Sequence, residues 1–304
     1  MIILAKSSMD INQIECKLNI GCDGIEIQLL DELVNGSLGN YNLAKDVYDL
    51  KSFSNVPVNV VHSPLLSHYG FSDVNLESFL DSDFKMLDQV FYIANYFGQL
   101  QNKKVIVVVH SESDRDTMML VSDTWKKVLN GVGCLLFKYP YTEIAIENVT
   151  PFIKVNSGDI HMCNNFHFDN IEMVRELRKQ LNTDRVGTVL DICHAVITKR
   201  YMNVIYKEFD IEPTDDFELD TYFAKNKDYI KLVHLANTDG NGYGKGHGTP
   251  FKSNDFDELK DIIDLYYKYS YTCPVTLEVG ESNYLVSDNY RVTRETLLKV
   301  LEQR

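Results

Sequence analysis

The sequence lacks the features that mark membrane, disulfide-rich and disordered proteins. None of its apolar runs approaches the roughly 18 residues that a membrane-spanning helix needs. The six cysteines are scattered and form no Cys-x-x-Cys pair, a pattern typical of reduced thiols in a cytosolic protein. No proline-, glycine- or serine-rich linker, charge block or low-complexity tract divides the chain. We therefore expect a cytoplasmic protein in which residues 1–304 form a single domain.

Basic residues are also few relative to acidic ones. The chain has 30 lysines and arginines against 44 aspartates and glutamates, a formal net charge of −14. An acidic chain has no general attraction for nucleic acid or for anionic lipid, so we expect neither DNA or RNA nor a membrane as a partner. Hydrophobic residues make up 44% of the chain, enough to bury a sizeable core. The sequence leaves the oligomeric state open, including a homo-oligomer.

Eight short apolar runs rich in valine and isoleucine recur along the chain. Runs of this kind suit parallel strands that are covered on both faces. They occupy residues 2–5, 24–29, 57–62, 104–110, 143–149, 186–192, 229–235 and 274–279. Segments with apolar residues at three- and four-residue spacing lie between the runs. These segments predict helices over 75–99, 170–181, 256–269 and 285–302.

Repeated alternation of strand and helix predicts an α/β protein with a (β/α)8 TIM barrel. A doubly wound open sheet is the alternative, although it would not normally need eight such units. In a barrel all strands are parallel, and their carboxyl ends meet at one mouth. Polar residues at the strand ends should therefore lie close together.

Side chains that can bind a metal end six of the expected strands or follow them closely. These residues are His62, His110, Glu147, Asp191, His194, His234, His247 and Glu278. A single histidine at a strand end is usually just hydrogen-bonded, so the prediction depends on the whole set. Carboxylates packed together without a cation would repel one another, whereas imidazole and carboxylate suit a divalent transition metal. The set predicts a metal site, with Mn, Zn, Co or Fe as candidates.

Two further features are weaker. Glu26 and Gln28 share one face of the second expected strand, where they either form a polar layer inside the barrel or touch a substrate. The glycine-rich loop 239–247 fits neither the dinucleotide-binding nor the phosphate-loop motif, and we interpret it as a loop that delivers His247 to the mouth. Lys245 in this loop is either a solvated lysine or a contact to a substrate phosphate or carboxylate.

The motifs IAIENV (144–149) and VLDICHA (189–195) resemble those of the xylose isomerase-like barrels, and so do GCDGIEIQL near the start and VTLEVGE near the end. This superfamily includes sugar and sugar-phosphate isomerases and epimerases, and also the endonuclease IV branch (AP endonuclease family 2). The resemblance implies one divalent metal held by four residues of the expected strands 5 to 8. Those residues are Glu147, Asp191, His234 and Glu278.

The residues and the resemblance together predict a metal-dependent isomerase or epimerase of a sugar, a sugar phosphate or a related polyol-ketone. Glu147 and Glu278 would be catalytic, one removing and the other returning a proton by way of an enediolate. His194, Glu26 and Lys245 would bind this small sugar-like substrate.

Two alternatives stay open. The endonuclease IV branch holds several zinc ions, and His62, His110 and His247 would provide a second metal site for phosphodiester hydrolysis by an AP endonuclease. Against this, Lys245 stands where that branch has an aspartate ligand. The other alternative is a sugar-binding barrel without catalysis, in which Glu147 and Glu278 would not both be needed.

Overall fold

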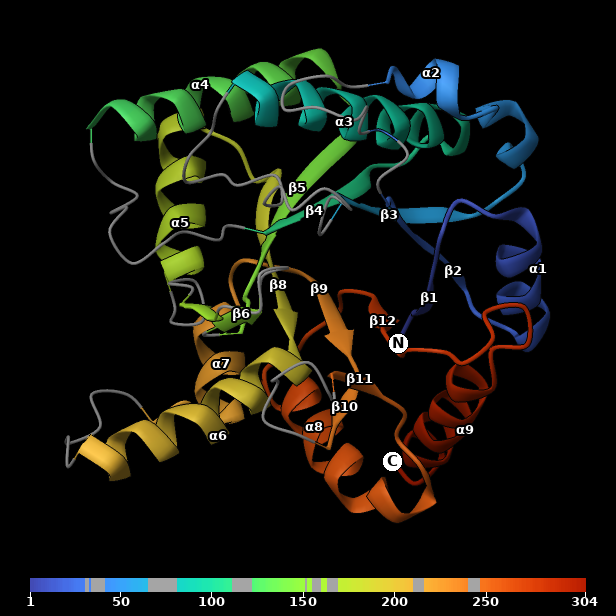
Figure 1. Cartoon of the computed structure of the whole chain (residues 1–304), viewed down its shortest axis with the longest axis vertical. Coiled ribbons are helices and arrows are strands. Elements are labelled where there is room, and N and C mark those ends of the chain that lie inside the picture. The colour runs from blue at the N-terminus through green and yellow to red at the C-terminus, as the bar shows by residue number, and fades with distance from the viewer. Residues whose placement is uncertain are drawn as a thin grey trace.

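Eight parallel strands form a closed barrel in the computed structural model of the protein, which confirms the expected (β/α)8 fold (Figure 1). The model describes residues 1–30, 33, 42–64, 81–110, 122–150, 152–154, 160–162, 169–209, 216–239 and 247–304. The barrel strands are β1 (Ile3–Ser7), β2 (Gly24–Gln28), β3 (Val58–His62), β4 (Val105–His110), β5 (Thr142–Glu147), β8 (Val186–Asp191), β9 (Ile230–Leu235) and β12 (Val275–Leu277). They follow one another around the barrel in chain order, and β12 pairs with β1 to close it.

Helices cover the outside of the barrel, with α3 and α4 on one side and α8 and α9 on the opposite side (Figure 1). They are α1 (Ile11–Ile20), α2 (Ala44–Val47), α3 (Asp81–Gln101), α4 (Ser122–Lys138), α5 (Asp169–Leu181), α6 (Ile192–Phe209), α7 (Leu219–Asn226), α8 (Phe256–Lys268) and α9 (Asp288–Glu302). Short 3-10 turns lie at Leu50–Phe53 and Ser253–Asp255. Two small hairpins pair β6 (Phe152–Lys154) with β7 (Ile160–Met162), and β10 (Asn237–Thr238) with β11 (His247–Thr249).

The helices expected from the sequence correspond to α3, α5, α8 and α9. Residues 75–80 of the first lie outside the described part of the chain. The last begins at Asp288, three residues later than expected, because Ser287 has a φ of 56° and a left-handed backbone cannot continue a helix.

Helix α1 shows how local chemistry sets the boundaries of an element. The side chain of Asp10 accepts hydrogen bonds from the backbone N–H groups of Asn12 and Gln13, which satisfies donors that the first turn leaves unpaired. At the other end Gly21 has a φ of 103°, a left-handed conformation that glycine adopts without a steric cost. The helix therefore begins and ends where its sequence dictates.

Buried apolar side chains form two layers that the barrel wall separates. The outer layer lies between the strands and the helices and includes Ile25, Phe91 and Leu297. The inner layer lies inside the barrel and consists of Leu4, Val60, Ile106, Val108, Ala145, Val189 and Leu232. Side chains alternate across a strand, so a residue two positions after a member of the inner layer also faces the barrel axis. This periodicity determines which side chains reach the mouth.

Two findings bear on the expectations from composition. No helix in the described part of the chain is long and apolar enough to cross a membrane. The described cysteines are Cys16, Cys22, Cys134, Cys193 and Cys273, and all of them are free thiols. The sixth, Cys163, lies outside the described residues.

Candidate metal centre at the mouth of the barrel

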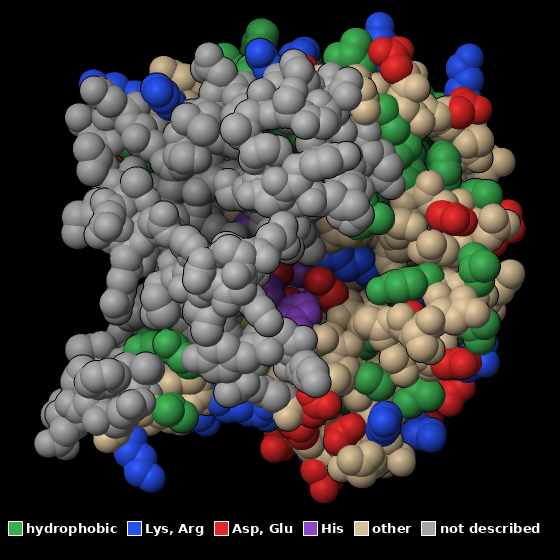
Figure 2. Space-filling model, in the orientation of Figure 1, with side chains coloured by type: hydrophobic (Ala, Val, Ile, Leu, Met, Phe, Trp, Pro, Cys, Tyr) green, Lys and Arg blue, Asp and Glu red, His purple; other side chains and the backbone are tan. Residues whose placement is uncertain are grey.

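The site residues lie one layer above the inner core, at the carboxyl ends of the strands. Glu147, Asp191 and His234 each follow a member of the inner apolar layer by two positions, and His62 and His110 do the same on β3 and β4. The alternation of side chains therefore turns all of them toward the barrel axis. Figure 2 shows histidine and acidic side chains together in a hollow at the centre of the molecule, beside a basic side chain.

His234 lies at the centre of this group and is completely buried. Its Nδ1 lies 2.8 Å from Oε2 of Glu278, 3.2 Å from Oε1 of Glu147 and 3.9 Å from Oδ2 of Asp191. Three carboxylates from three different strand ends thus face one ring nitrogen. The sequence prediction that these four side chains converge agrees with their placement, and their ligand atoms all lie within 4.8 Å of one another.

The geometry of these atoms fits a shared cation. Ligands that each lie about 2.1 Å from one ion can be at most about 4.2 Å apart, and all three carboxylates meet this limit relative to Nδ1 of His234. Nδ1 of His234 and Oε2 of Glu278 are buried and form no hydrogen bond within the described residues. They face each other at 2.8 Å without hydrogen-bond geometry, and a metal ion between them would satisfy both buried atoms.

Asp191 is positioned by the backbone. It directly precedes α6, and its Oδ1 accepts a hydrogen bond of 2.6 Å from the backbone N–H of His194, as a residue at a helix N-terminus commonly does. Asn148 fixes the same turn, because its side chain accepts from the backbone N–H of Asp191 and donates to the backbone carbonyl of Asp191. Oδ1 is thus occupied, and Oδ2 faces His234.

The charges of this cluster depend strongly on one another. Burial, together with the carboxylates of Glu147 and Glu278, raises the pKa of Asp191 to about 7. Burial alone would lower the pKa of His234, but Glu26, Glu147 and Glu278 outweigh it and raise that pKa well above its usual value. Without a metal, the protein therefore holds protons where a metal would bind.

Glu147 is a buried carboxylate with a histidine near each of its oxygens. Burial acts to raise its pKa, but His234 and His110 outweigh burial and hold the pKa well below the usual value. Its Oε2 lies 3.3 Å from Nε2 of His62 and 3.3 Å from Nε2 of His110. Two histidines of the expected second metal site, His62 and His110, therefore both approach Oε2 of Glu147, whereas Oε1 faces His234.

His194 and His247 lie on the outer side of the cluster. Nδ1 of His194 contacts the carbonyl of Asn148 at 2.8 Å and lies 3.5 Å from Oε1 of Glu147, while its Nε2 lies 2.8 Å from Nε2 of His247. His247 is exposed and forms a third ligand group with Asp191 and Cys193 rather than with His62 and His110. The expected second site therefore divides into two groups.

The other residues with expected substrate contacts have different positions. Glu26 is fully buried, and its Oε2 lies 3.1 Å from Nε2 of His234 and accepts a hydrogen bond of 2.7 Å from the hydroxyl of Thr276. The amide of Gln28 donates to the carbonyls of Leu29 and Ser63. Lys245 lies outside the described residues. A substrate contact of Glu26 or Lys245 stays a prediction.

Sequence reasoning missed Lys6. Its ammonium lies 2.7 Å from Oε1 of Glu278 and 3.4 Å from Oε1 of Glu26, inside the barrel mouth. The first strand extends to Ser7 rather than ending at residue 5, and Lys6 follows the inner-layer residue Leu4 by two positions. Lys6 directly follows the apolar run 2–5, and the same pattern of a polar residue at the end of an apolar run is what identified the histidines.

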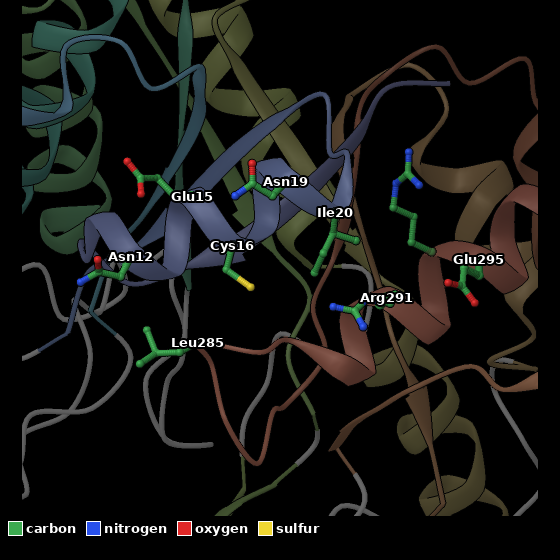
Figure 3. A pocket seen from close by; sticks show the side chains of 9 residues that line it. Asn12, Glu15, Cys16, Asn19, Ile20, Leu285, Arg291 and Glu295 are labelled. Carbon is green, nitrogen blue, oxygen red and sulfur yellow. The ribbon is translucent and has the colours of Figure 1, made fainter.

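A separate cavity of about 530 Å³ lies between α1 and α9, outside the barrel (Figure 3). Its lining includes Arg291 and Arg294, and also the carboxylates of Glu15 and Glu295. The lining therefore has two basic and two acidic side chains, without an excess of either charge. None of the described ligands of the barrel mouth lines this cavity. We place the chemistry at the barrel mouth, where carboxylates and imidazoles converge.

Comparison with known proteins agrees with the barrel fold. The family described as the xylose isomerase-like TIM barrel matches residues 18–299 of the chain, which include every candidate ligand. Among curated proteins, none has a sequence that matches this one.

Solved structures share the fold at low sequence identity. The 3-keto-D-glucoside 4-epimerase YcjR from E. coli has a TM-score of 0.55 at 15% identity, covering 99% of each chain. The D-allulose 3-epimerase from Methylomonas sp., in complex with D-allulose, has a TM-score of 0.60 at 13% identity, covering 100% of this chain and 97% of its own. The probable 3-DHS dehydratase AsbF from Bacillus anthracis has a TM-score of 0.53 at 14% identity, covering 100% of each chain.

Proposed function

The chain belongs to the xylose isomerase-like TIM barrel family, and from this premise we propose that it is a divalent-metal-dependent isomerase or epimerase. Its substrate would be a sugar, a sugar phosphate or a related polyol-ketone. The observation that carries the proposal is the approach of three carboxylates to Nδ1 of His234, at 2.8, 3.2 and 3.9 Å. Glu147, Asp191, His234 and Glu278 would hold Mn, Zn, Co or Fe, because this donor set suits those ions.

The carboxylates of Glu147 and Glu278 would carry out the proton transfers. A bound divalent cation would supply stabilisation of the negative charge that develops on substrate oxygen. Glu147 would remove the proton from the carbon beside the carbonyl, giving an enediolate, and Glu278 would return a proton from the other side, drawn from the ammonium of Lys6 that hydrogen-bonds its Oε1. Both residues reach the same small volume, because each contacts Nδ1 of His234 from a different strand end. Inversion at carbon or a carbonyl shift would result.

A small polar substrate suits the open side of the cluster. His194 and His247 lie there, with Nε2 of His194 turned toward His247 rather than toward the carboxylates. We assign His194 to a substrate hydroxyl, which would take the place of His247 as its partner. The epimerases among the solved structures act on sugars, which supports a sugar as the substrate class. A cytoplasmic location and a single domain remain predictions alongside this function.

Exchange of a carbon-bound proton tests the proposal directly. The metal-loaded protein would be incubated in deuterated water with a panel of ketopentoses, ketohexoses and their phosphates. Proton NMR would then show deuterium entering the position beside the carbonyl of the true substrate. Glu278→Gln should lower the rate of product formation, followed in the same spectra, by about 10²–10⁴-fold, the usual effect of losing a general acid or base. A Glu278→Gln protein that kept full turnover would end the assignment.

The matched control for this variant is Glu143→Gln. Glu143 is also a glutamate of a barrel strand with a lysine partner, Lys231, at 3.0 Å. It lies two positions before Ala145, so it is on the same face of β5 as Glu147 but at the amino end of the strand, away from the barrel mouth. We expect it to keep full exchange activity, which separates loss of chemistry from loss of a buried charge pair.

The second candidate function is phosphodiester hydrolysis with more than one metal. The observation in its favour is that His62 and His110 both approach Oε2 of Glu147 at 3.3 Å, a second ligand group that shares Glu147 with the first. Metal counting separates the two functions. One tightly bound ion per chain supports the isomerase, whereas two or three ions and cleavage of an abasic-site duplex would support the hydrolase.

A further inference from the structure

We propose that Lys6 is a positioning residue of this site: its ammonium occupies Oε1 of Glu278, so that Glu278 offers only Oε2 to a metal. This inference rests on the proposed function, because it concerns how one of the proposed ligands is held. It adds to the four ligands a residue from β1, the strand at which the barrel closes.

The barrel register brings Lys6 level with its two acidic partners. Lys6 pairs directly with Glu26 on β2. On the other side Ala5 pairs with Leu277 on β12, so the next residue along, Lys6, lies beside Glu278. Because Leu4 faces the inner core, Lys6 two positions later also faces the axis. The backbone therefore places this lysine between two glutamates.

The two oxygens of Glu278 are divided between different partners. Oε1 accepts a hydrogen bond of 2.7 Å from the ammonium of Lys6, which is a charge-assisted bond of ordinary length. Oε2 lies 2.8 Å from Nδ1 of His234 and has no hydrogen-bond partner in the described part of the chain. The hydrogen bond from Lys6 fixes the rotation of the carboxylate, and Oε2 is left to bind a metal ion.

The two oxygens of Asp191 also have different partners. Its Oδ1 is held by the backbone N–H of His194 and its Oδ2 faces His234. Glu278 lies beyond the end of β12, and no backbone N–H in the described part of the chain donates to its carboxylate, so Lys6 supplies the equivalent contact. Each of these two carboxylates thus keeps one oxygen occupied and turns the other inward.

Charge also favours a lysine at this position. Glu26, Glu147, Asp191 and Glu278 bring four carboxyl groups into one buried cluster. A divalent ion would balance only part of that charge, and a buried carboxylate without a counter-charge is strongly unfavourable. Lys6 has a side chain that is 12% exposed and contacts two of the four carboxylates, so it provides a positive charge beside Glu26 and Glu278.

The test uses the visible absorption of the Co²⁺-loaded full-length protein, which responds to the number and geometry of ligands. Metal would be removed with a chelator and replaced by one equivalent of Co²⁺ per chain. In Lys6→Met the freed Oε1 allows Glu278 to bind with both oxygens, so we expect the visible band to shift and weaken. Lys6→Arg, which keeps a cationic donor, should restore a spectrum close to that of the wild type.

Lys231→Met is the matched control. Lys231 also stands on a barrel strand, with a side chain that is 20% exposed and a glutamate partner at 3.0 Å, but that partner is Glu143, which no metal group includes. Its Co²⁺ spectrum should match the wild type. Circular dichroism would check folding, and Lys6→Gln would replace Lys6→Met if the methionine variant did not fold.

The outcomes separate this inference from the function on which it rests. A Lys6→Met spectrum that superimposes on those of the wild type and Lys231→Met would overturn the role of Lys6 and leave the metal centre intact. A wild-type protein that takes up no Co²⁺ would overturn the metal centre and the role of Lys6 together. A change in Lys6→Met that Lys6→Arg reverses would support the proposal.

Discussion

Glu26 contacts His234 on the side of the ring that faces away from the other carboxylates: Oε2 of Glu26 lies 3.1 Å from Nε2. This contact leaves Nδ1 turned toward Glu147, Asp191 and Glu278. A carboxylate on the far nitrogen of a ligand histidine fixes the orientation of the ring and makes it a stronger ligand. The geometry therefore supports a role for Glu26 in orienting His234.

The first prediction concerns this contact. Glu26→Gln removes the negative charge beside Nε2 while keeping the size of the side chain, and we expect metal affinity to fall by about 10–100-fold. Competition with a chromophoric chelator would measure the change. Glu143→Gln, at the amino end of β5 and away from the barrel mouth, should leave the affinity unchanged. Equal affinity for Glu26→Gln and the wild type would show that Glu26 does not support His234.

The second prediction concerns pH. The pKa of Asp191 is raised to about 7, so below pH 7 the metal-free site carries a proton that a metal must displace. The raised pKa of His234 adds a second such proton. Metal affinity should therefore rise with pH and fall by about tenfold per pH unit below 7 for each proton displaced. Titrations at pH 6, 7 and 8 would measure the slope.

Calorimetry in buffers of different ionisation enthalpy would count the released protons separately. Asp191→Asn removes the carboxyl group that carries one of them. This variant should bind metal more weakly and release fewer protons per ion than the wild type at pH 6. An affinity that did not change between pH 6 and 8 would contradict the protonation states that we assign to Asp191 and His234.

The third prediction separates substrate binding from metal binding. His194 contacts Asn148 and His247, and its ring lies outside the group of four ligands. We expect His194→Ala to raise KM for the substrate while metal affinity changes little, because the lost contact binds the substrate and not the ion. Steady-state kinetics and the chelator competition would be compared on the same preparation. A large loss of metal affinity would instead make His194 a ligand.

The fourth prediction concerns stability away from the mouth. Lys17 on α1 is buried and lies 3.5 Å from Oε1 of Glu281, and Glu281 also accepts backbone hydrogen bonds from Asn289 and Tyr290 at the start of α9. Glu281→Gln leaves the ammonium buried without a counter-charge, so we expect the free energy of unfolding to fall by about 3–5 kcal/mol. Urea denaturation, monitored by circular dichroism, would measure it.

An exposed ion pair provides the comparison for this variant. Asp220 lies 2.6 Å from Lys268, and both side chains are about half exposed. Water replaces such a contact at little cost, so Asp220→Asn should change stability far less than Glu281→Gln. Similar effects of the two substitutions would show that burial does not decide the strength of these pairs.

Periodicity explains why much of this site is readable from the chain. A strand presents alternate side chains to opposite faces, so apolar residues at 145 and 189 predict that Glu147 and Asp191 face the same interior. The same rule predicts from Leu4 that Lys6 faces the interior. A lysine ammonium is not a metal ligand, however, so the pattern of candidate ligands does not include Lys6. Only the pairing of β1 with β2 and β12 brings Lys6 between Glu26 and Glu278.

The sequence by itself determined the fold, the set of candidate ligands and the edge of the barrel at which they meet, because hydrophobic period and strand order are local properties of the chain. The tertiary structure alone decided how the atoms of those ligands are shared. It turned Nδ1 of His234 toward three carboxylates and Nε2 toward Glu26, and gave one oxygen of Glu278 to Lys6. Such a division depends on distances between strands that are remote in the chain, and no local pattern encodes them.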